Sequence, residues 1–499
     1  MQYFIGIDNG GTLVKAAIYD ESGKRMACAR ELLEMEIPAS GWSERDMEKL
    51  WEANCQVLKR VIGISNVAPE NIKAISFSGH GKGIYLVDEK GHPVRKGILS
   101  TDTRASGIMQ KWQKNGIAEK MYEHTHQGLR ACQPICLLRW LAENEPETLA
   151  HTKWIFGVND YIRYRMTGIA GGELTNYSGS GMMDLDNRCI SYEVLKLAGL
   201  ENLIEKCPPL LKPEEIAGFV TKEAAEAAGL PEGMVCAAGL FDIDACAIGM
   251  GITDHSRIAV LAGTWGINEY ISEKYVEDSR TRMNSCYCIE GWYLVEESSP
   301  TSVSNFEWFV RNIVRDKWMG VHTRDNLYDY ADHLAEELDM YENIPVFLPY
   351  LFGGPAHSNA FGCFLGLQAN HTYSHMIRSI MEGIVFCHRQ HLDKLLKNRT
   401  KPCAVRLGGG ICASDFWVRM FADILKIPIE LQDAKEPGTL GAAMTAAIAC
   451  GHFHSFREAV EQTVRIKSIV YPDPTVRDIY QKKYDEYLRT AKYMEGYWL

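Results

Sequence analysis

The sequence lacks any stretch that is both long and apolar enough to be expected to cross a membrane. After the N-terminus, the longest apolar stretch runs from Met234 to Ile252 and is interrupted by Asp242 and Asp244, whereas a spanning helix needs about 20 predominantly apolar residues. The short apolar run from Phe4 to Ile7 ends at Asp8, unlike a secretory signal peptide. We therefore expect neither a membrane anchor nor a cleaved leader.

The sequence also lacks an excess of positive charge. Its 53 lysines and arginines stand against 64 aspartates and glutamates, for a formal net charge of −11. Nonspecific binding to nucleic acid or to an anionic membrane requires a basic face. We therefore expect neither nucleic acid nor membrane as a partner.

A disulfide framework and a zinc site are likewise not expected. The 15 cysteines are odd in number and have no regular spacing, which favours reduced thiols in a cytoplasmic protein. Several histidines and cysteines lie close in sequence but do not complete the four-ligand spacing of structural zinc. These are His371 with His375, His388 with His391, and the group of His124, His126, Cys132 and Cys136.

The remaining composition is ordinary, with 46% hydrophobic and 23% charged residues, as in soluble globular proteins. A length of 499 residues gives room for several domains, since a domain takes roughly 100–200 residues. Strand and helix patterns alternate near the start. Phe4 to Ile7 and Val14 to Tyr19 form an expected hairpin, Met47 to Ile62 an amphipathic helix and Ala74 to Ser78 a strand. This alternation predicts an α/β fold.

The strand-turn pattern of the first hairpin recurs downstream. Ile258 to Leu261 leads into a turn containing Gly263 and Thr264, and Ala404 to Leu407 leads into Gly408-Gly409-Gly410. A single turn of this kind is more often only a tight hairpin. Because such turns expose backbone N–H groups and hydroxyls that bind phosphates, three in order indicate a nucleotide held between two related halves.

The recurrence of the turn places a domain boundary near Gly249 to Asp254, giving domains of residues 1–250 and 251–499. The last 45 residues are expected to form two helices divided by Tyr471-Pro472-Asp473-Pro474. Neither G-x-G-x-x-G at the start of a helix nor G-x-x-x-x-G-K-[ST] is present, so a Rossmann or P-loop nucleotide site is not expected.

Two segments resemble motifs of known families. The first, IGIDNGGTLVKAAIYD, is similar to the first phosphate-binding hairpin of the actin, hexokinase and heat-shock-protein superfamily. The second begins with Gly362 to Leu367 and continues, after seven residues, with His375 to Glu382. It fits the second signature of the FGGY carbohydrate kinases at every specified position. The resemblance implies an α/β protein of two ribonuclease H-like domains around a cleft, with sugar mainly on the first domain and ATP mainly on the second.

Other segments are similar to this family in order and spacing. Gly41 to Asp46 resembles its G-W-x-E-x-D segment, Gly408 to Asp415 its adenosine-binding turn, and Gly438 to Ala443 its Gly-Ala-Ala helix start. The first family signature is kept only in part around Cys132 to Glu143, where Leu137 stands at a position usually held by lysine.

The resemblance implies a catalytic base. The family uses an aspartate in a Gly-x-x-Asp run that is followed seven residues later by glycine, and Gly239, Asp242 and Gly249 match it. Asp242 is therefore expected to accept the proton of the sugar hydroxyl. Asp244 is the neighbouring rival, but its spacing to both glycines differs. Without the family, Asp242 is equally well explained as the N-cap of a helix from Ala245 to Met250.

The resemblance also implies a site for ATP and Mg²⁺. Asp8 is the expected metal ligand, since Mg²⁺ needs only one or two carboxylates besides water and phosphate oxygens; a turn-capping role is the alternative. Thr12 and Thr264 are expected to donate to the β- and γ-phosphates, and Lys15 either adds charge or lies solvated on its strand. The expected ATP-binding residues are Gly10, Gly11, Thr12, Lys15, Gly263, Thr264, Gly409, Gly410 and Ser414.

Sugar contacts are expected in two loops, from Ser78 to Gly83 and from Leu99 to Arg104. The implied substrate-binding residues are His80, Lys82, Asp102, Arg104 and Asp242. A strand-end lysine and a turn aspartate are the alternatives for Lys82 and Asp102. The sequence Gly-His-Gly-Lys-Gly looks most like the L-xylulose kinase branch, in which 3-keto-L-gulonate is another substrate, and a lysine in the pocket suits a sugar acid.

The sequence therefore predicts an ATP-dependent kinase of a small ketose, best matched by L-xylulose or a related keto sugar. A D-xylulose kinase, or a kinase of another pentulose or polyol, is the alternative within this class. From another class, an inactive sugar- or nucleotide-responsive binding protein on the same scaffold is the alternative; the retained Asp8, Thr12, Thr264 and Asp242 argue against it. The family often forms dimers, so a homodimer is the implied assembly.

Overall fold

The computed structural model describes residues 1–276, 283–314, 324–355, 360–397 and 399–498. The chain forms two compact units, each assembled from three stretches of sequence. Unit 1 comprises Met1–Thr253, Ile271–Val295 and Glu436–Val464, and unit 2 comprises Asp254–Tyr270, Glu296–Lys435 and Arg465–Leu499. Unit 1 thus includes two stretches from the second half of the chain. Within the described ranges, no helix combines the length and hydropathy that a membrane crossing requires.

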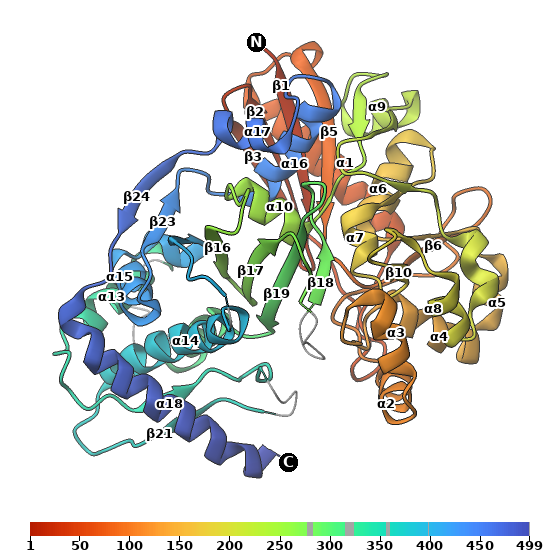
Figure 1. Cartoon of the computed structure of the whole chain (residues 1–499). Helices are drawn as coiled ribbons and strands as arrows, with labels where there is room; N and C mark the ends of the chain where they lie inside the picture. The colour runs from red at the N-terminus through yellow and green to blue at the C-terminus, as the bar shows by residue number, and fades with distance from the viewer. Residues whose placement is uncertain (277–282, 315–323, 356–359, 398, 499) are drawn as a thin grey trace. The chain divides into compact units, whose positions relative to one another are not determined.

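Unit 1 is built on a mixed sheet of seven described strands in the order β13-β14-β5-β1-β2-β3, with β15 also paired to β5 (Figure 1). Strand β1 is antiparallel to β2 and parallel to β5, and β14 and β15 are also parallel to β5. The strands are β1 (Tyr3–Asn9), β2 (Leu13–Asp20), β3 (Arg25–Leu32), β5 (Ile72–Gly79), β13 (Ile216–Phe219), β14 (Val235–Ala237) and β15 (Leu240–Phe241). The hairpin expected at the N-terminus and the strand expected at Ala74 to Ser78 are confirmed.

Helices cover both faces of this sheet, since successive residues of β1 face opposite sides and both sides are buried. Ile5 and Ile7 point into an apolar core shared with Leu50 and Leu58 of α1, whereas Gly6, between them, faces α16. The helices of unit 1 are α1 (Met47–Ser65), α2 (Ser106–Lys114), α3 (Ile117–Thr125), α4 (Pro134–Asn144), α5 (Pro146–His151), α6 (Val158–Thr167), α7 (Leu174–Ser178), α8 (Tyr192–Leu197), α9 (Lys222–Ala228), α10 (Asp242–Gly249), α16 (Pro437–Ala449) and α17 (Phe456–Thr463). The expected helix from Met47 to Ile62 is confirmed as α1.

Short two-stranded pairings complete unit 1. They join β4 (Glu44–Arg45) to β7 (Gly97–Ile98), β6 (Tyr85–Val87) to β8 (Trp154–Phe156), β9 (Gly172–Glu173) to β12 (Leu210–Leu211), and β10 (Met183–Asp184) to β11 (Cys189–Ile190). These pairings lie outside the main sheet; β4 comes from the segment between β3 and α1, and the other strands come from the chain that connects β5 to β13.

A second sheet repeats the arrangement, with seven described strands in the order β18-β19-β17-β16-β22-β23-β24 (Figure 1). Here β16 is antiparallel to β17 and parallel to β22, as β1 is to β2 and β5. The strands are β16 (Arg257–Ala262), β17 (Gly266–Ser272), β18 (Met283–Cys286), β19 (Tyr293–Ser299), β22 (Ala404–Gly408), β23 (Ile429–Gln432) and β24 (Ile466–Val470). Of these strands, β16, β22, β23 and β24 belong wholly to unit 2, whereas β18 falls in the Ile271–Val295 stretch of unit 1. Unit 2 also contains the pair β20 (Val346–Leu348) and β21 (Cys363–Leu365), and helices α11 (Ser304–Phe309), α13 (Arg324–Glu336), α14 (Tyr373–Leu395), α15 (Asp415–Leu425) and α18 (Arg477–Trp498).

The signature segment has a structural role in unit 2. On α14, Arg378 Nε donates to Glu382 Oε1 at 2.8 Å, and Lys483 Nζ of α18 lies 2.9 Å from the same carboxylate oxygen. Arg378 also donates to the hydroxyl of Tyr480 at 3.1 Å. A buried charge is tolerated only when it is paired, so these contacts join α14 to the C-terminal helix.

The expectation of two helices in the last 45 residues is incomplete. Helices α17 and α18 are present, but Ile466–Val470 forms β24, antiparallel to β23. Four of the five residues of β24 are exposed. An edge strand with so little burial has no alternating apolar face, so the sequence carries no period-2 signal for it.

Glycines allow α10, α16 and β1 of unit 1 to pack at backbone distance. A Cβ added to Gly249 of α10 would lie 2.0 Å from the carbonyl oxygen of Pro437, and one added to Gly441 of α16 would lie 2.1 Å from that of Ala245. On β1, a Cβ at Gly6 would lie 1.9 Å from the carbonyl oxygen of Thr439. Only glycine fits at these three crossings.

This packing predicts that Gly249→Ala destabilises the protein. The added methyl group would overlap a backbone oxygen that cannot rotate away, and overpacking of this kind costs about 1–3 kcal/mol. Gly63→Ala is the matched control, because Gly63 lies in α1 and nothing lies within 4 Å of its added Cβ; it should be neutral or stabilising by up to about 1 kcal/mol. Thermal and urea unfolding measure both variants, and equal stabilities would contradict the packing account.

Candidate active site

Three neighbouring strands of unit 1 end at the same edge of the sheet. In the parallel pairings, Asp8 of β1 and Leu240 of β15 both lie opposite Ser78 of β5, and Phe241 lies opposite Gly79. The segments that follow these strands therefore start side by side. Open α/β sheets bind ligands at the carboxyl ends of their strands, and this edge brings together the turn after Asp8, the loop at His80 to Lys82, and Asp242.

Asp242 is the first residue of α10 and is half-buried. The helix starts three residues earlier than the alternative interpretation assumed, so Asp242 lies inside its first turn and Phe241 is the N-cap. An acidic side chain there is favoured by the helix dipole. The glycine of the motif, Gly239, has φ of 112°, and an added Cβ would lie 2.4 Å from Phe77 O. Gly239 thus lets the chain approach β5 just before the aspartate.

Asp244 lies in different surroundings, since its side chain is fully buried. Its Oδ1 accepts a hydrogen bond from Cys288 N at 3.1 Å, and its Oδ2 has no hydrogen-bond partner among the described residues. Burial raises the pKa of Asp244 well above that of an exposed aspartate, and the nearby Glu173 raises it further. A general base must come within hydrogen-bond reach of the proton that it accepts, so the full burial of Asp244 and its bond from Cys288 N favour Asp242 over its neighbour.

Asp8 lies at the end of β1 beside the N-terminus of α16. Its Oδ1 accepts from Ser78 Oγ at 3.1 Å, and a Cβ on Gly438 would lie 3.3 Å from its Oδ2. Burial raises the pKa of Asp8, opposed by the charge of Lys15 and the bond from Ser78. A half-buried carboxylate with one oxygen engaged by a hydroxyl fits Mg²⁺, which combines one or two carboxylates with water and phosphate oxygens.

Lys15 is not a solvated strand residue. Its Nζ lies 2.7 Å from Oε2 of Glu436, and both side chains are mostly buried. Burial acts to lower the pKa of Lys15, but the charges of Glu436 and Asp8 outweigh it and raise that pKa. The positive charge is therefore retained near Asp8 and shared with Glu436, a partner that the sequence reasoning missed because it lies 421 residues away.

The first glycine turn is open to solvent. Gly11 and Thr12 are exposed, and a Cβ added to Gly11 would meet nothing within 4 Å. Gly10 N donates to Leu13 O at 3.1 Å, so this N–H closes the turn and is already engaged. The exposed hydroxyl of Thr12 and the open backbone at Gly11 are the groups best placed to contact phosphate.

The loop after β5 carries His80 and Lys82. His80 is buried, its Nε2 lies 3.0 Å from the hydroxyl of Tyr85, and burial lowers its pKa to about 4. The imidazole is therefore neutral at pH 7. Lys82 is half-buried with φ of 67°, and in the described part of the chain its Nζ has no ion-pair partner. Lys82 lines a cavity of about 20 Å³ together with Asn176 and Ser180. Because no ion pair among the described residues neutralises its charge, the ammonium group is available to a ligand.

Asp102 and Arg104 form a closed pair. Oδ1 of Asp102 accepts from N and Nε of Arg104, at 2.9 and 3.0 Å, and Oδ2 accepts from Arg104 Nη2 at 2.8 Å and from Ser43 N at 2.7 Å. The guanidinium also lies 4.1 Å from the ring centre of Trp42. Four bonds fill the acceptor capacity of a carboxylate, so a sugar hydroxyl could bind Asp102 only by displacing one of them.

In unit 2, two of the expected nucleotide turns lie side by side. Strands β16 and β22 are parallel with Leu261 opposite Gly408, so the turn at Gly263 and Thr264 starts next to Gly409 and Gly410. Gly409 has φ of 109°, and an added Cβ would lie 2.2 Å from Ala262 O. Ser414 begins α15, where its Oγ accepts from Trp417 N at 3.0 Å. Its hydroxyl therefore serves first as a helix cap.

A buried network holds the Gly-Thr turn of unit 2. Val303 N donates to Gly263 O at 3.0 Å, and Ser304 Oγ donates to Thr264 O at 3.0 Å. His388 of α14 lies 2.8 Å from Asn268 Oδ1 through Nδ1 and 3.0 Å from Ser302 Oγ through Nε2. Burial lowers the pKa of His388 to about 3, so the neutral ring donates to Asn268 and accepts from Ser302. No motif in the sequence singled out this network.

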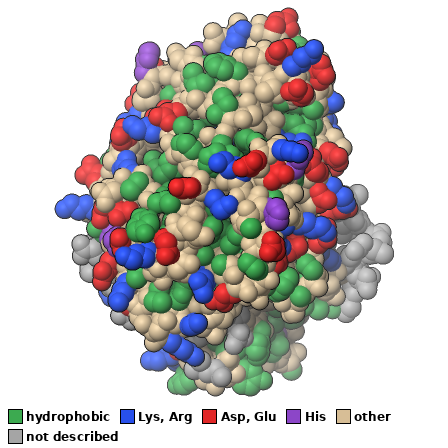
Figure 2. All heavy atoms as spheres, turned by 90° about the vertical axis from the view of Figure 1, so that its right-hand side faces the viewer, with side chains coloured by type: hydrophobic (Ala, Val, Ile, Leu, Met, Phe, Trp, Pro, Cys, Tyr) green, Lys and Arg blue, Asp and Glu red, His purple; other side chains and the backbone are tan. Residues whose placement is uncertain are grey.

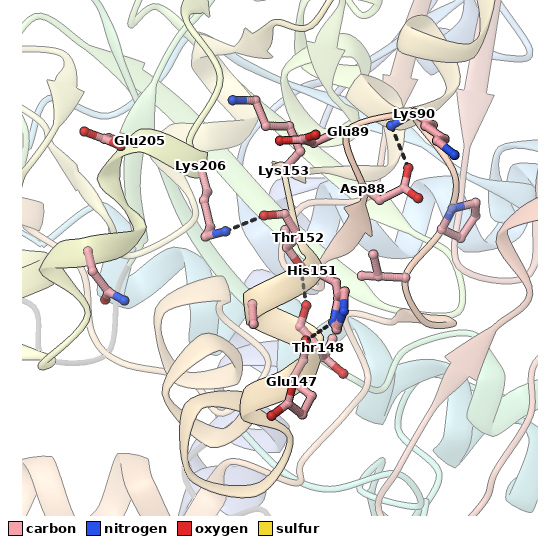
Figure 3. A pocket seen from close by; sticks show the side chains of 14 residues that line it. Asp88, Glu89, Lys90, Glu147, Thr148, His151, Thr152, Lys153, Glu205 and Lys206 are labelled. Carbon is pink, nitrogen blue, oxygen red and sulfur yellow. Dashed lines mark hydrogen bonds between the residues drawn. The ribbon is translucent and has the colours of Figure 1, made fainter.

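A separate pocket of about 840 Å³ lies on unit 1 (Figure 3). Acidic residues such as Asp88 and Glu205 and basic residues such as Lys90 and Lys206 share it, and Lys206 donates to the backbone oxygen of Thr152. Figure 2 likewise shows acidic and basic side chains interspersed over the face that it presents. The pocket includes none of the expected site residues among its described lining, so its size does not mark the active site.

Comparison with known proteins decides the family. Residues 3–249 match the N-terminal domain of the FGGY family of carbohydrate kinases, and residues 258–450 match its C-terminal domain. The chain belongs to this family. The expected enzyme class is thereby confirmed, because members of the family phosphorylate sugars.

Individual relatives of this FGGY kinase agree with the family over nearly its whole length. It is 34% identical over 491 residues to a probable L-xylulose kinase of Pasteurella multocida, covering 98% of each chain. It is 33% identical over 497 residues to the L-xylulose/3-keto-L-gulonate kinase of Escherichia coli, covering 99% of this chain and 98% of that one. A ligand-bound xylulose kinase of Lactobacillus acidophilus has a similar structure, with a TM-score of 0.90, 24% identity and 99% of each chain covered. The expected two-domain α/β fold is confirmed.

The burial of Asp244 predicts how stability of the kinase depends on pH. Because its pKa is raised in the folded state, the unfolded chain releases this proton first, and stability falls as pH rises above about 4. Asp244→Asn keeps an acceptor for Cys288 N but does not titrate. The melting temperature of Asp244→Asn, relative to that of the wild type at the same pH, should therefore increase from pH 5 to pH 8. Parallel pH profiles for the two proteins would show that Asp244 is not protonated in the fold.

Proposed function

We propose that this FGGY kinase transfers the terminal phosphate of ATP to a hydroxyl of a small ketose, with L-xylulose as the first candidate. The observation that carries the proposal is that the segments bearing Asp242, His80 and Lys82 start at one edge of the unit 1 sheet. The names of the two L-xylulose kinase relatives support the choice of sugar. We place the sugar on residues 1–250 and ATP mainly on residues 251–499.

Phosphoryl transfer requires positioning, charge neutralisation and one proton acceptor. In the proposed mechanism, Asp242 accepts the proton of the attacking hydroxyl, while neutral His80 and charged Lys82 bind other sugar oxygens. Thr12 and Thr264 donate to phosphate oxygens from their exposed turns. Asp8, with Ser78 on its other oxygen, would hold Mg²⁺, and the metal when bound neutralises phosphate charge.

Lys82 gives a reason to consider a sugar acid as well. Its ammonium group has no ion-pair partner among the described residues, and a carboxylate on the substrate would supply one. The relative from Escherichia coli is named for both L-xylulose and 3-keto-L-gulonate. A keto sugar acid is therefore the second substrate that we propose for the same site.

The protein is also proposed to be cytoplasmic and to form a homodimer. The odd number of cysteines without scaffold spacing supports a reducing compartment. The dimer rests on the family resemblance.

Substrate choice is tested by ADP release over a panel of pentuloses, polyols and keto sugar acids, with ATP and Mg²⁺ present. We expect the highest kcat/KM with L-xylulose, followed by 3-keto-L-gulonate. Higher kcat/KM with D-xylulose would overturn the choice of sugar. No turnover with any member would favour a binding protein on the same scaffold.

The role of Asp242 is tested by Asp242→Asn, which keeps the size of the side chain but cannot accept a proton. Loss of a positioned base should lower kcat by about 10²–10⁴-fold with little change in the KM for sugar. Asp244→Asn is the matched control two residues away and should retain most of its turnover. The opposite result, with activity lost only in Asp244→Asn, would assign the base to Asp244.

A further inference from the structure

A buried polar cluster lies behind the strand that leads into Asp242. It consists of Glu173, Thr175, Asn176 and Asn159, and none of these side chains is exposed by more than 5%. Glu173 precedes the short helix α7 and accepts hydrogen bonds from Thr175 N at 2.7 Å and Asn176 N at 2.9 Å. Buried polar groups are costly unless they are paired. The hydrogen-bond partners of Thr175, Asn159 and Asn176 therefore show which backbone segments the cluster fixes in place.

The hydroxyl of Thr175 has a fixed orientation. Its Oγ1 donates to Oε2 of Glu173 at 2.8 Å, the same oxygen that accepts from Asn176 N. Its lone pairs then face Phe241 N, which donates to Thr175 Oγ1 at 2.9 Å. Phe241 is the N-cap of α10, and the next residue is Asp242. A single hydroxyl thus connects the buried carboxyl group of Glu173 to the backbone directly before the proposed base.

Asn159 also bonds this strand, and Asn176 in turn bonds Asn159. Asn159 Nδ2 donates to Leu240 O at 3.4 Å, and Asn159 Oδ1 accepts from Asn176 Nδ2 at 2.9 Å. Asn176 Nδ2 also lies 3.5 Å from Gly79 O, next to His80. Both residues of β15 are therefore bonded by side chains of the cluster, Leu240 by Asn159 and Phe241 by Thr175, and Asn176 joins Asn159 to the start of the sugar loop.

The ring of Phe241 also connects the bonded strand β15 to the loop that carries His80 and Lys82. A Cβ added to Gly81 would lie 2.3 Å from Phe241 Cε2, so the ring packs directly against the loop between His80 and Lys82. Any displacement of Phe241 would therefore move both Asp242 and the loop. Such a linkage matters because a shift of about 1 Å in a catalytic group can cost about 100-fold in rate.

We propose that Thr175, oriented by Glu173, is a positioning residue for Asp242: it fixes the N–H of Phe241 and thereby the start of α10. Thr175 touches neither sugar nor phosphate in this arrangement. The inference rests on the proposed function, because it assigns Asp242 as the base. It goes beyond that function by explaining what holds Asp242 in a fixed position.

The test replaces Thr175 by valine, which keeps the shape and removes the hydroxyl. We expect kcat with the preferred sugar to fall about 10- to 100-fold, with the KM for ATP unchanged. Thr175→Ser restores the hydroxyl and should recover most of the lost kcat. A merely structural threonine would lower the melting temperature without this split between kcat and KM.

Thr167→Val is the matched control. Thr167 is also buried in unit 1, its Oγ1 donates to Arg163 O at 3.0 Å, and it accepts from Ile169 N at 3.1 Å. This variant should lose comparable stability and keep kcat. If Thr175→Val and Thr167→Val have the same kcat as the wild type, the positioning role is overturned.

Asp242→Asn, assayed in the same series, separates this inference from the proposed function. Near-normal kcat in Asp242→Asn overturns the base assignment and the positioning role with it. Loss of kcat in Asp242→Asn together with normal kcat in Thr175→Val leaves the base in place and overturns only the role of Thr175. Crystal structures of Thr175→Val and the wild type complete the test, and an unmoved Phe241 in the variant would also count against the inference.

Discussion

The close crossing of α10, α16 and β1 is the constraint on which the site of unit 1 depends. Backbone meets backbone at Gly249, Gly441 and Gly6, each of which has a carbonyl oxygen where a Cβ would stand. This crossing brings the start of α16 beside Asp8 and holds α10, which begins with Asp242, against the same sheet. The dispersion attraction of each pair of atoms is weak, but the sum over all atom pairs of such a crossing is large. The glycine seven residues after Asp242, Gly249, thus has a packing role at this crossing, and Gly239 has one against Phe77 O of β5.

Around this crossing, charge and hydrogen bonding assign different roles to similar residues. Asp242 and Asp244 are two residues apart, yet one is half-buried at the helix start and the other is fully buried beside Cys288 N. Lys15 is committed to Glu436, whereas Lys82 has no ion-pair partner among the described residues. Environment, more than residue type, therefore separates groups that stabilise the fold from groups that remain available to a ligand. Because the net charge is acidic, we propose that such local basic groups, exposed N–H groups and a metal attract ATP.

Much of this could be predicted from the sequence, because hairpins, the helix α1 and the glycine turns leave local periodic signals. The family signature and Asp242 were also legible as short motifs. The edge strand β24 was not, since exposed residues carry no apolar alternation. The Lys15–Glu436 pair, the bond from Ser43 N to Asp102 and the bond from Phe241 N to Thr175 depend on three-dimensional contacts. They join residues 421, 59 and 66 positions apart, and no local pattern in the sequence predicts such pairings.

We propose that the sugar lies at the carboxyl edge of β1, β5 and β15 with its reacting hydroxyl on Asp242. A crystal structure of the Asp242→Asn variant with L-xylulose bound tests it most directly, because the variant should hold the sugar without turning it over. We predict a sugar hydroxyl within about 3 Å of the side chain of residue 242, a hydrogen-bond distance, and a second sugar oxygen near Lys82. A sugar bound away from this edge, for example against residues of the separate surface pocket, would contradict the account.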